Sequence, residues 1–282
     1  ALLLTNEKDK HKRTLMKSDM ITEIYQILCK LLGTPPNPNE KFQWSFTLYL
    51  DLTDQIERET KRRRTGDYEN LQIKNTVEIS PLEFYDQFAI TNFDSYCHFG
   101  NDPRNPYFKY YESNDCDVVI GGKKNGFFNV PIDLLSNFAS KSIINNTPVE
   151  FDCDVVKYLN PEEELMDNKC YNYSLVFGDN FDNLNKKQNL LCINSNPNHA
   201  MVFVGVDITK DNKIIKWKVE NSWGRHHGIE KSTGYYTMSH DWFEKYVYNI
   251  VVQNKYVSTD ILKQYKKALK NPVILPLFDV MG

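Results

Sequence analysis

The sequence has no long apolar run, no C-x-x-C pair and no marked excess of charge of either sign. A membrane-spanning helix needs roughly 20 consecutive apolar residues, and no stretch approaches that length, so no membrane segment is predicted. The 34 basic residues nearly balance the 37 acidic ones, so the net charge of −3 does not predict a general affinity for nucleic acid. Without C-x-x-C spacing, the six cysteines do not predict a zinc or redox motif.

The composition of the chain is typical of a globular protein. Hydrophobic residues make up 41% and aromatic residues 13% of the 282 positions, which is enough for a sizeable core. A core of that size does not need disulfides, so we expect reduced thiols. Reduced thiols favour the cytoplasm, with the mitochondrion as the alternative.

The first half reads as helices joined by extended segments. Apolar residues at helical spacing predict a helix over 14–32, and Gly33 ends it. Even-spaced apolar residues predict an extended segment over 42–50. Ser80 and Glu83 have the spacing of a capping box that begins another helix.

A basic run, Lys61 to Arg64, lies within the polar stretch 53–70. A solvated surface loop is the favoured interpretation, because no aromatic or glycine residues interleave with the charges. The alternative is a nucleic-acid or targeting patch, for which the support is weak.

The second half reads mostly as strands. Short β-type runs occur at 149–156, 200–207, 214–222 and 247–257. Ser239 predicts the start of a short helix, and a polar helix over 258–270 leads into an apolar tail. Helices followed by antiparallel strands predict the α+β class.

One histidine stands out among six. His199 directly precedes an apolar strand, and Asn221 directly follows the next strand, so an antiparallel pair would bring them together. The other five, including His98 and His240, are expected in solvated positions. A cysteine nucleophile needs an imidazole base, and an amide carbonyl can orient that base without adding charge. Trp223 is expected to shield the pair from water.

These residues carry a family resemblance. His-Ala-Met at 199–201 and Val-Glu-Asn-Ser-Trp-Gly at 219–224 resemble the second half of papain-like cysteine peptidases, and more narrowly the bleomycin hydrolase and aminopeptidase C family. Further segments that resemble this family are 32–36, 80–85, 101–104, 153–155, 242–243 and 275–282. The resemblance implies that His199 is the general base and Asn221 its orienter.

The resemblance also implies a domain division. Residues 1–145 would be a helical insertion with its connections, and 146–257 would be the antiparallel β-barrel half that carries His199 and Asn221. Residues 258–282 would form a C-terminal helix and an arm, which includes Leu275, Pro276 and Gly282. In this family the arm runs along the active-site cleft and makes the enzyme an aminopeptidase.

The nucleophile of the family is missing from this chain. Family members carry it before the histidine, in a Gln…Cys-Trp context, and none of the six cysteines has that setting. Cys153 resembles a structural Cys-Asp-Val segment of the family. We expect a C-terminal fragment of the enzyme, which without the nucleophile is inactive alone. The alternative is a catalytically inactive homologue that acts as a binding or assembly module.

For the intact protein the resemblance implies a cysteine-type aminopeptidase. Its substrates would be peptides, homocysteine thiolactone and bleomycin, and it would form a homohexamer. It implies no metal and no organic cofactor.

Overall fold

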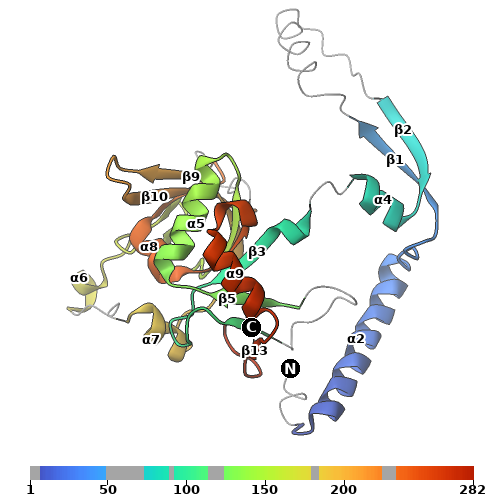
Figure 1. Cartoon of the computed structure of the whole chain (residues 1–282), viewed down its shortest axis with the longest axis horizontal. Coiled ribbons are helices and arrows are strands. Elements are labelled where there is room, and N and C mark those ends of the chain that lie inside the picture. The colour runs from blue at the N-terminus through green and yellow to red at the C-terminus, as the bar shows by residue number, and fades with distance from the viewer. Residues whose placement is uncertain (1–6, 49–72, 89–91, 114–123, 179–183, 224–232) are drawn as a thin grey trace, which may run out of the picture. The chain divides into compact units, whose positions relative to one another are not determined.

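The computed structural model describes residues 7–48, 73–88, 92–113, 124–178, 184–223 and 233–282 (Figure 1). The chain forms two compact units, Ala1–Thr91 and Asn92–Gly282, and each is described here by itself. The basic run Lys61 to Arg64 and Cys116 lie outside the described residues. None of the described helices is long and apolar enough to cross a membrane.

The first unit begins with helix α2, Lys10–Leu32. The predicted helix over 14–32 is confirmed, and it starts four residues earlier because Asp9 caps it. The Asp9 side chain accepts from the backbone N–H groups of His11 and Lys12. At the other end Gly33 adopts φ 92°, a left-handed value that suits glycine.

A hairpin and a short helix complete the described part of this unit. Strand β1, Phe42–Leu48, pairs antiparallel with β2, Ile73–Ile79. The capping box of helix α4, Pro81–Phe88, is confirmed. The backbone N–H of Ser80 donates to the Glu83 carboxylate at 2.9 Å, and the N–H of Glu83 donates to Ser80 Oγ at 3.2 Å.

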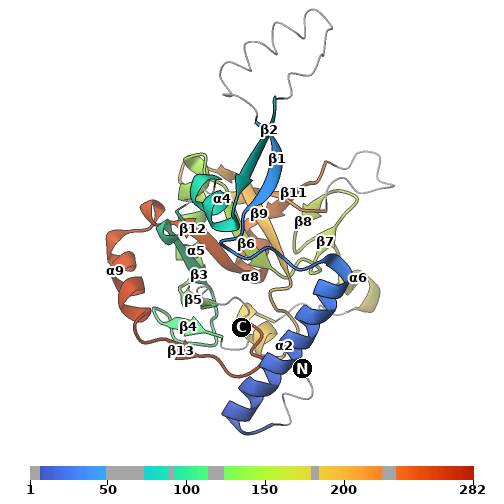
Figure 2. The ribbon, with the colours of Figure 1, turned by 90° about the vertical axis from the view of Figure 1, so that its right-hand side faces the viewer.

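The second unit is built on one mostly antiparallel sheet of eleven described strands (Figures 1 and 2). Their order is β13-β4-β5-β3-β12-β6-β9-β10-β11-β8-β7. The strands are β3 Tyr96–Gly100, β4 Tyr110–Glu112, β5 Gly126–Asn129, β6 Val149–Cys153, β7 Leu159–Asn160, β8 Leu165–Met166, β9 His199–Ile208, β10 Ile214–Glu220, β11 Tyr235–Ser239, β12 Val247–Gln253 and β13 Val273–Ile274. The described helices are α5 Ile132–Ile144, α6 Tyr173–Phe177, α7 Lys186–Leu191, α8 His240–Tyr246 and α9 Thr259–Ala268, with 3₁₀ turns at Phe93–Ser95 and Asn254–Tyr256. The predicted α+β class is confirmed.

Strands β3, β4 and β5 correct the expectation of a mostly helical first half. They lie before residue 130, yet they belong to the same sheet as the strands of the second half. Each has only three to five residues, and a run that short shows no periodicity that separates strand from helix. The predicted boundary at residue 145 therefore differs from the division at residue 91, and it stays a prediction.

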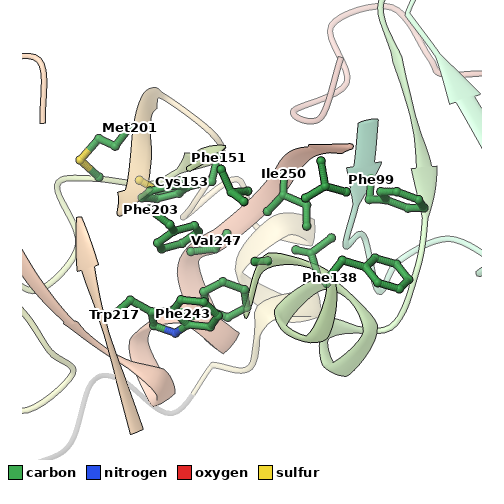
Figure 3. Close-up of a cluster of buried hydrophobic side chains, with 14 of the residues drawn as sticks. Phe99, Phe138, Phe151, Cys153, Met201, Phe203, Trp217, Phe243, Val247 and Ile250 are labelled. Atoms are coloured by element: carbon green, nitrogen blue, oxygen red, sulfur yellow. The ribbon is translucent and has the colours of Figure 1, made fainter. Parts of the chain in front are cut away.

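The larger of the two hydrophobic clusters buried among the described residues lies on one face of this sheet. Helix α5 packs across β6, β9 and β12, and Figure 3 shows the aromatic side chains that fill the space. Phe151 and Phe203 stack with ring centroids 3.8 Å apart, and Trp217 stacks on Phe243 at 4.8 Å. Because alternate residues of a strand point to opposite faces, the neighbours of these core residues face away from the core.

Lys186 has a buried side-chain amine at the start of α7. Its Nζ donates to the backbone carbonyl of Val247 and lies 4.9 Å from the ring centroid of Tyr248. Burial lowers the pKa of Lys186 to about 7, although Asp102 and Glu244 act in the opposite direction.

This lysine should make the stability of the protein depend on pH. Between pH 7 and 10.5 the unfolded chain keeps the Lys186 proton while the folded chain loses it, so stability rises with pH in this window. Relative to Lys186→Met, the wild-type chain should gain about 1.4 kcal/mol per pH unit there. Urea unfolding of both proteins at pH 7 and pH 9 measures this, and the other groups cancel in the difference. Parallel stability curves for the two proteins would contradict it.

Candidate active site

His199 and Asn221 meet at the end of a strand pair. His199 begins β9, and Asn221 follows β10, which pairs antiparallel with β9. His199 Nε2 lies 3.0 Å from Asn221 Oδ1. An amide oxygen can only accept, so Nε2 carries the proton of a neutral ring, and Nδ1 is the nitrogen that can take up another proton. The prediction that the side chains of His199 and Asn221 lie next to each other is confirmed.

The surroundings hold this pair in place. Asn221 is only 5% exposed, and its backbone N–H donates to the Gly234 carbonyl at 3.1 Å. The ring of Trp223 lies over His199, with centroids 4.9 Å apart and planes at 39°. The expected contact of Trp223 with the pair is therefore present, but 43% of Trp223 is exposed, so it covers the imidazole from one side only.

The turn before His199 is fixed by a buried carboxylate. Asn198 Nδ2 donates to Asp154 Oδ1 at 2.6 Å, and Asn198 Oδ1 accepts from the backbone N–H of Val155 at 3.1 Å. The second oxygen of Asp154 accepts from Ser195 Oγ at 2.7 Å, which in turn accepts from the hydroxyl of Tyr248 at 2.6 Å. This chain of bonds anchors the residue next to the imidazole.

A cavity of about 380 Å³ opens beside His199. Its walls come from the start of β9, from the sheet face away from the core, and from the C-terminal arm. The arm contributes Leu275, Val280, Met281 and Gly282. Pro276, which was predicted with the arm, is exposed and does not line the cavity.

The arm is held by specific contacts. The N–H of Leu275 donates to the carbonyl of Glu112 at 2.8 Å, and the side chains of Leu275 and Met281 are buried. Arg104 donates to Asp279 at 2.7 Å and to the buried carboxylate of Asp102 at 2.9 Å. These contacts place the arm against the cavity that His199 also lines.

Among the described residues of the second unit, no cysteine lines the cavity beside His199. Cys153 lies opposite His199 in the ladder between β6 and β9, but it is fully buried in the core. Burial, followed by the charges of Asp152 and Asp154, raises the pKa of the Cys153 thiol, the reverse of what a nucleophile needs. Within the described ranges, no three His, Cys, Asp or Glu side chains form a group that could hold a metal ion.

Two histidines differ from the expectation of solvated positions. His240 is partly buried, its Nδ1 accepts from Trp217 Nε1 at 3.4 Å, and burial lowers its pKa. His98 lies in β3 and lines the cavity, and burial lowers its pKa against the Gly126 carbonyl and the Glu150 charge. The turn residues that follow His98 in the sequence predicted a turn region, so its position in a strand was missed.

Sequence reasoning also missed Asp152 and Asn249, which line the same cavity. Both lie in strands that the sequence predicted, at polar positions between apolar neighbours. The alternation of polar and apolar residues was the only pattern in the sequence that pointed to these two positions. It shows that a side chain faces away from the core, but it does not show what that side chain contacts.

Comparison with known proteins gives the class. The profile described as the Peptidase C1-like family matches residues 2–282. The chain is 34% identical to mouse bleomycin hydrolase over 270 residues, which is 93% of this chain and 53% of the relative. It is 28% identical to the mitochondrial cysteine proteinase 1 of Saccharomyces cerevisiae over 269 residues, 95% of this chain and 50% of the relative.

A solved structure agrees. The crystal structure of PepW from Lactobacillus rhamnosis matches with a TM-score of 0.75 and 28% identity, covering 99% of this chain and 57% of that one. The chain belongs to the Peptidase C1-like family, with the papain-like fold and relatives among the bleomycin hydrolases. It spans about half the length of the curated relatives it matches.

Proposed function

We propose that this chain is the part of a cysteine aminopeptidase that supplies the general base. The observation that carries the proposal is the 3.0 Å contact between His199 Nε2 and Asn221 Oδ1 beside a cavity that the C-terminal arm also lines. The names of the relatives, a hydrolase and a cysteine proteinase, agree with a thiol peptidase.

In this proposal His199 takes the proton of a cysteine thiol at Nδ1. Asn221 holds the ring by accepting from Nε2–H, so that Nδ1 faces the nucleophile in one orientation. The thiolate attacks the carbonyl carbon of the scissile bond, and the imidazolium returns its proton to the departing amine. Water, deprotonated by the same imidazole, then hydrolyses the thioester. The nucleophile itself comes from sequence outside these 282 residues.

The arm makes the peptidase an aminopeptidase in this proposal. Leu275, Met281 and Gly282 line the cavity that His199 shares, and Arg104 fixes the arm through Asp279. A peptide that extended beyond one residue on the N-terminal side of the scissile bond would collide with the arm. Only short N-terminal overhangs then reach the nucleophile.

The wider properties of the proposed enzyme are those that the family resemblance implies. Peptides, homocysteine thiolactone and bleomycin are the proposed substrates, as the family resemblance implies, and the name of the mouse relative agrees with bleomycin. A homohexamer and a cytoplasmic location, or a mitochondrial one as in the name of the yeast relative, are part of the same proposal.

The 282-residue chain alone should show no peptidase activity. Imidazole and amide groups cannot form the acyl intermediate without a cysteine nucleophile. The measurement is hydrolysis of an aminoacyl fluorogenic substrate by the purified chain, with and without iodoacetamide. Thiol-dependent turnover that iodoacetamide stops would show that one of the six cysteines present is the nucleophile.

The coding sequence upstream of Ala1 separates the two candidate functions. A Gln…Cys-Trp segment there supports the peptidase, and joining it to this chain should restore thiol-dependent hydrolysis. An upstream sequence without such a cysteine would favour the inactive binding or assembly module instead.

A further inference from the structure

We infer that the sheet face beside His199 carries a binding site for a primary ammonium group of a peptide, formed by His98, Asp152 and Asn249. The inference deepens the proposed function, because it names a chemical feature of the substrate. The experiment that tests it measures binding and not hydrolysis. The ammonium site and the proposed peptidase function can therefore fail independently of each other.

The strand register brings these residues onto one face. Ala200 of β9, Asp152 of β6, Asn249 of β12 and Gly100 of β3 are successive partners across four neighbouring strands. Directly opposite residues in antiparallel strands point to the same face, so the four form one row. His98 lies two residues from Gly100 on β3 and therefore shares the face.

This face points away from the larger hydrophobic core. The residues that alternate with the row, among them Phe151, Ile250 and Phe99, point into the core (Figure 3). His98, Asp152 and Asn249 instead line the cavity of about 380 Å³ together with His199. The polar cluster and the proposed base thus open into one space.

The cluster contains hydrogen-bond acceptors that no described residue satisfies. Asn249 is 5% exposed and donates from Nδ2 to Asp152 Oδ2 at 3.3 Å. Asn249 Oδ1 and His98 Nε2 are both buried and have no hydrogen-bond partner among the described residues. A neutral imidazole presents a lone pair at Nε2 when its proton is on Nδ1. Within the described chain, Asp152 has no cationic partner.

Gly100 allows one of these acceptors, Asn249 Oδ1, to take its place in the row. A Cβ atom at this position would lie 2.7 Å from Asn249 Oδ1 and 2.2 Å from Cδ2 of Phe127. Any larger residue would have to displace the phenyl ring or the amide. Glycine at this position leaves room for the Asn249 amide and the Phe127 ring, which pack against the backbone there.

A primary ammonium is the complement of this arrangement. It carries one positive charge and three N–H donors, which match one carboxylate and two neutral acceptors. Burial raises the pKa of Asp152, with the Asn249 hydrogen bond acting in the opposite direction. A partly buried carboxylate without a cation is costly, so a bound ammonium would stabilise its ionised form. A divalent metal would need more than one carboxylate or several further oxygen ligands.

A peptide offers this group from two sources, the N-terminal α-ammonium and a lysine side chain. Three probes separate them. N-acetyl-lysine amide has only the side-chain ammonium, norleucine amide has only the α-ammonium, and N-acetyl-norleucine amide has neither. Each is titrated into the ¹⁵N-labelled 282-residue chain, and Kd is obtained from NMR shifts.

At least one ammonium probe should bind about tenfold or more tightly than N-acetyl-norleucine amide, since a hydrogen bond to a charged group has roughly that effect. Asp152→Asn should remove that advantage while keeping the shape of the side chain. Asp260→Asn is the control, because it removes one highly exposed carboxylate from helix α9, which does not line the cavity. It should change Kd by less than about threefold.

His98→Leu is a second variant that removes one neutral acceptor without changing the charge of Asp152. It should weaken the ammonium probe severalfold and leave N-acetyl-norleucine amide unchanged. Equal binding of all three probes, or equal losses in Asp152→Asn and Asp260→Asn, would overturn the site. Binding of either ammonium probe that depends on Asp152 supports it and identifies the source.

Discussion

Replacing His199 with alanine in the full-length protein should lower kcat/KM for a peptide substrate by roughly 10²–10⁴-fold, the range that a positioned acid–base group contributes. Asn221→Ala should cost less, about tenfold, because the amide only orients the ring through the 3.0 Å contact. Steady-state kinetics with a fluorogenic aminoacyl substrate measures both. The order of the two losses is the informative result.

Further variants test the assignment of roles. His11→Ala removes an exposed histidine of the first unit and should leave kcat/KM within about twofold. Asn221→Asp retains an oxygen acceptor and should therefore recover part of what alanine loses. A His199→Ala protein that is folded and still turns over near the wild-type rate would refute the base assignment.

Deleting residues 275–282 from the full-length protein should relax its requirement for a free N-terminus. The arm lines the cavity beside His199, and in the proposal it occupies the side where residues before the scissile bond would lie. The ratio of kcat/KM for free-amine over N-acetylated peptides should fall by at least about tenfold, which corresponds to about 1.4 kcal/mol of lost discrimination. Longer peptides should then be cut internally.

A point substitution tests the same role of the arm in case the deletion variant does not fold. Leu275 and Met281 are buried, so their loss costs stability, whereas Asp279→Asn removes only the charge that pairs with Arg104. It should loosen the arm and shift the ratio in the same direction by a smaller factor. Lys270→Ala, an exposed position before the arm, is the control. An unchanged preference for free amines in the folded deletion variant would exclude the arm as the gate.

Local signals in the sequence predicted most of the separate elements. Helix α2 follows from apolar spacing and ends at Gly33, and α4 begins at the box that Ser80 and Glu83 form. Helix α8 begins after Ser239, whose Oγ accepts from the N–H of Trp242 at 3.3 Å. Each of these depends on residues within one or two turns of chain, so neighbouring residues suffice to specify it.

The contact between His199 and Asn221 could also be predicted from the sequence. The two residues bracket a single strand–turn–strand unit, and an antiparallel hairpin necessarily brings the start of one strand beside the end of the next. Their residue types then indicated the chemistry. The contact follows from local connectivity, even though 22 positions separate the two side chains.

The sequence by itself thus determined the class of the protein, its local elements and the paired imidazole and amide. Only the tertiary structure decided what surrounds that pair. His98, Asp152 and Asn249 come together because β3, β6 and β12 are neighbours in the sheet, although they are far apart in the chain. The arm lies at the cavity through an Arg104–Asp279 contact that spans 175 positions. Sheet order and long-range contacts arise from the packing of the whole core, which no local pattern encodes.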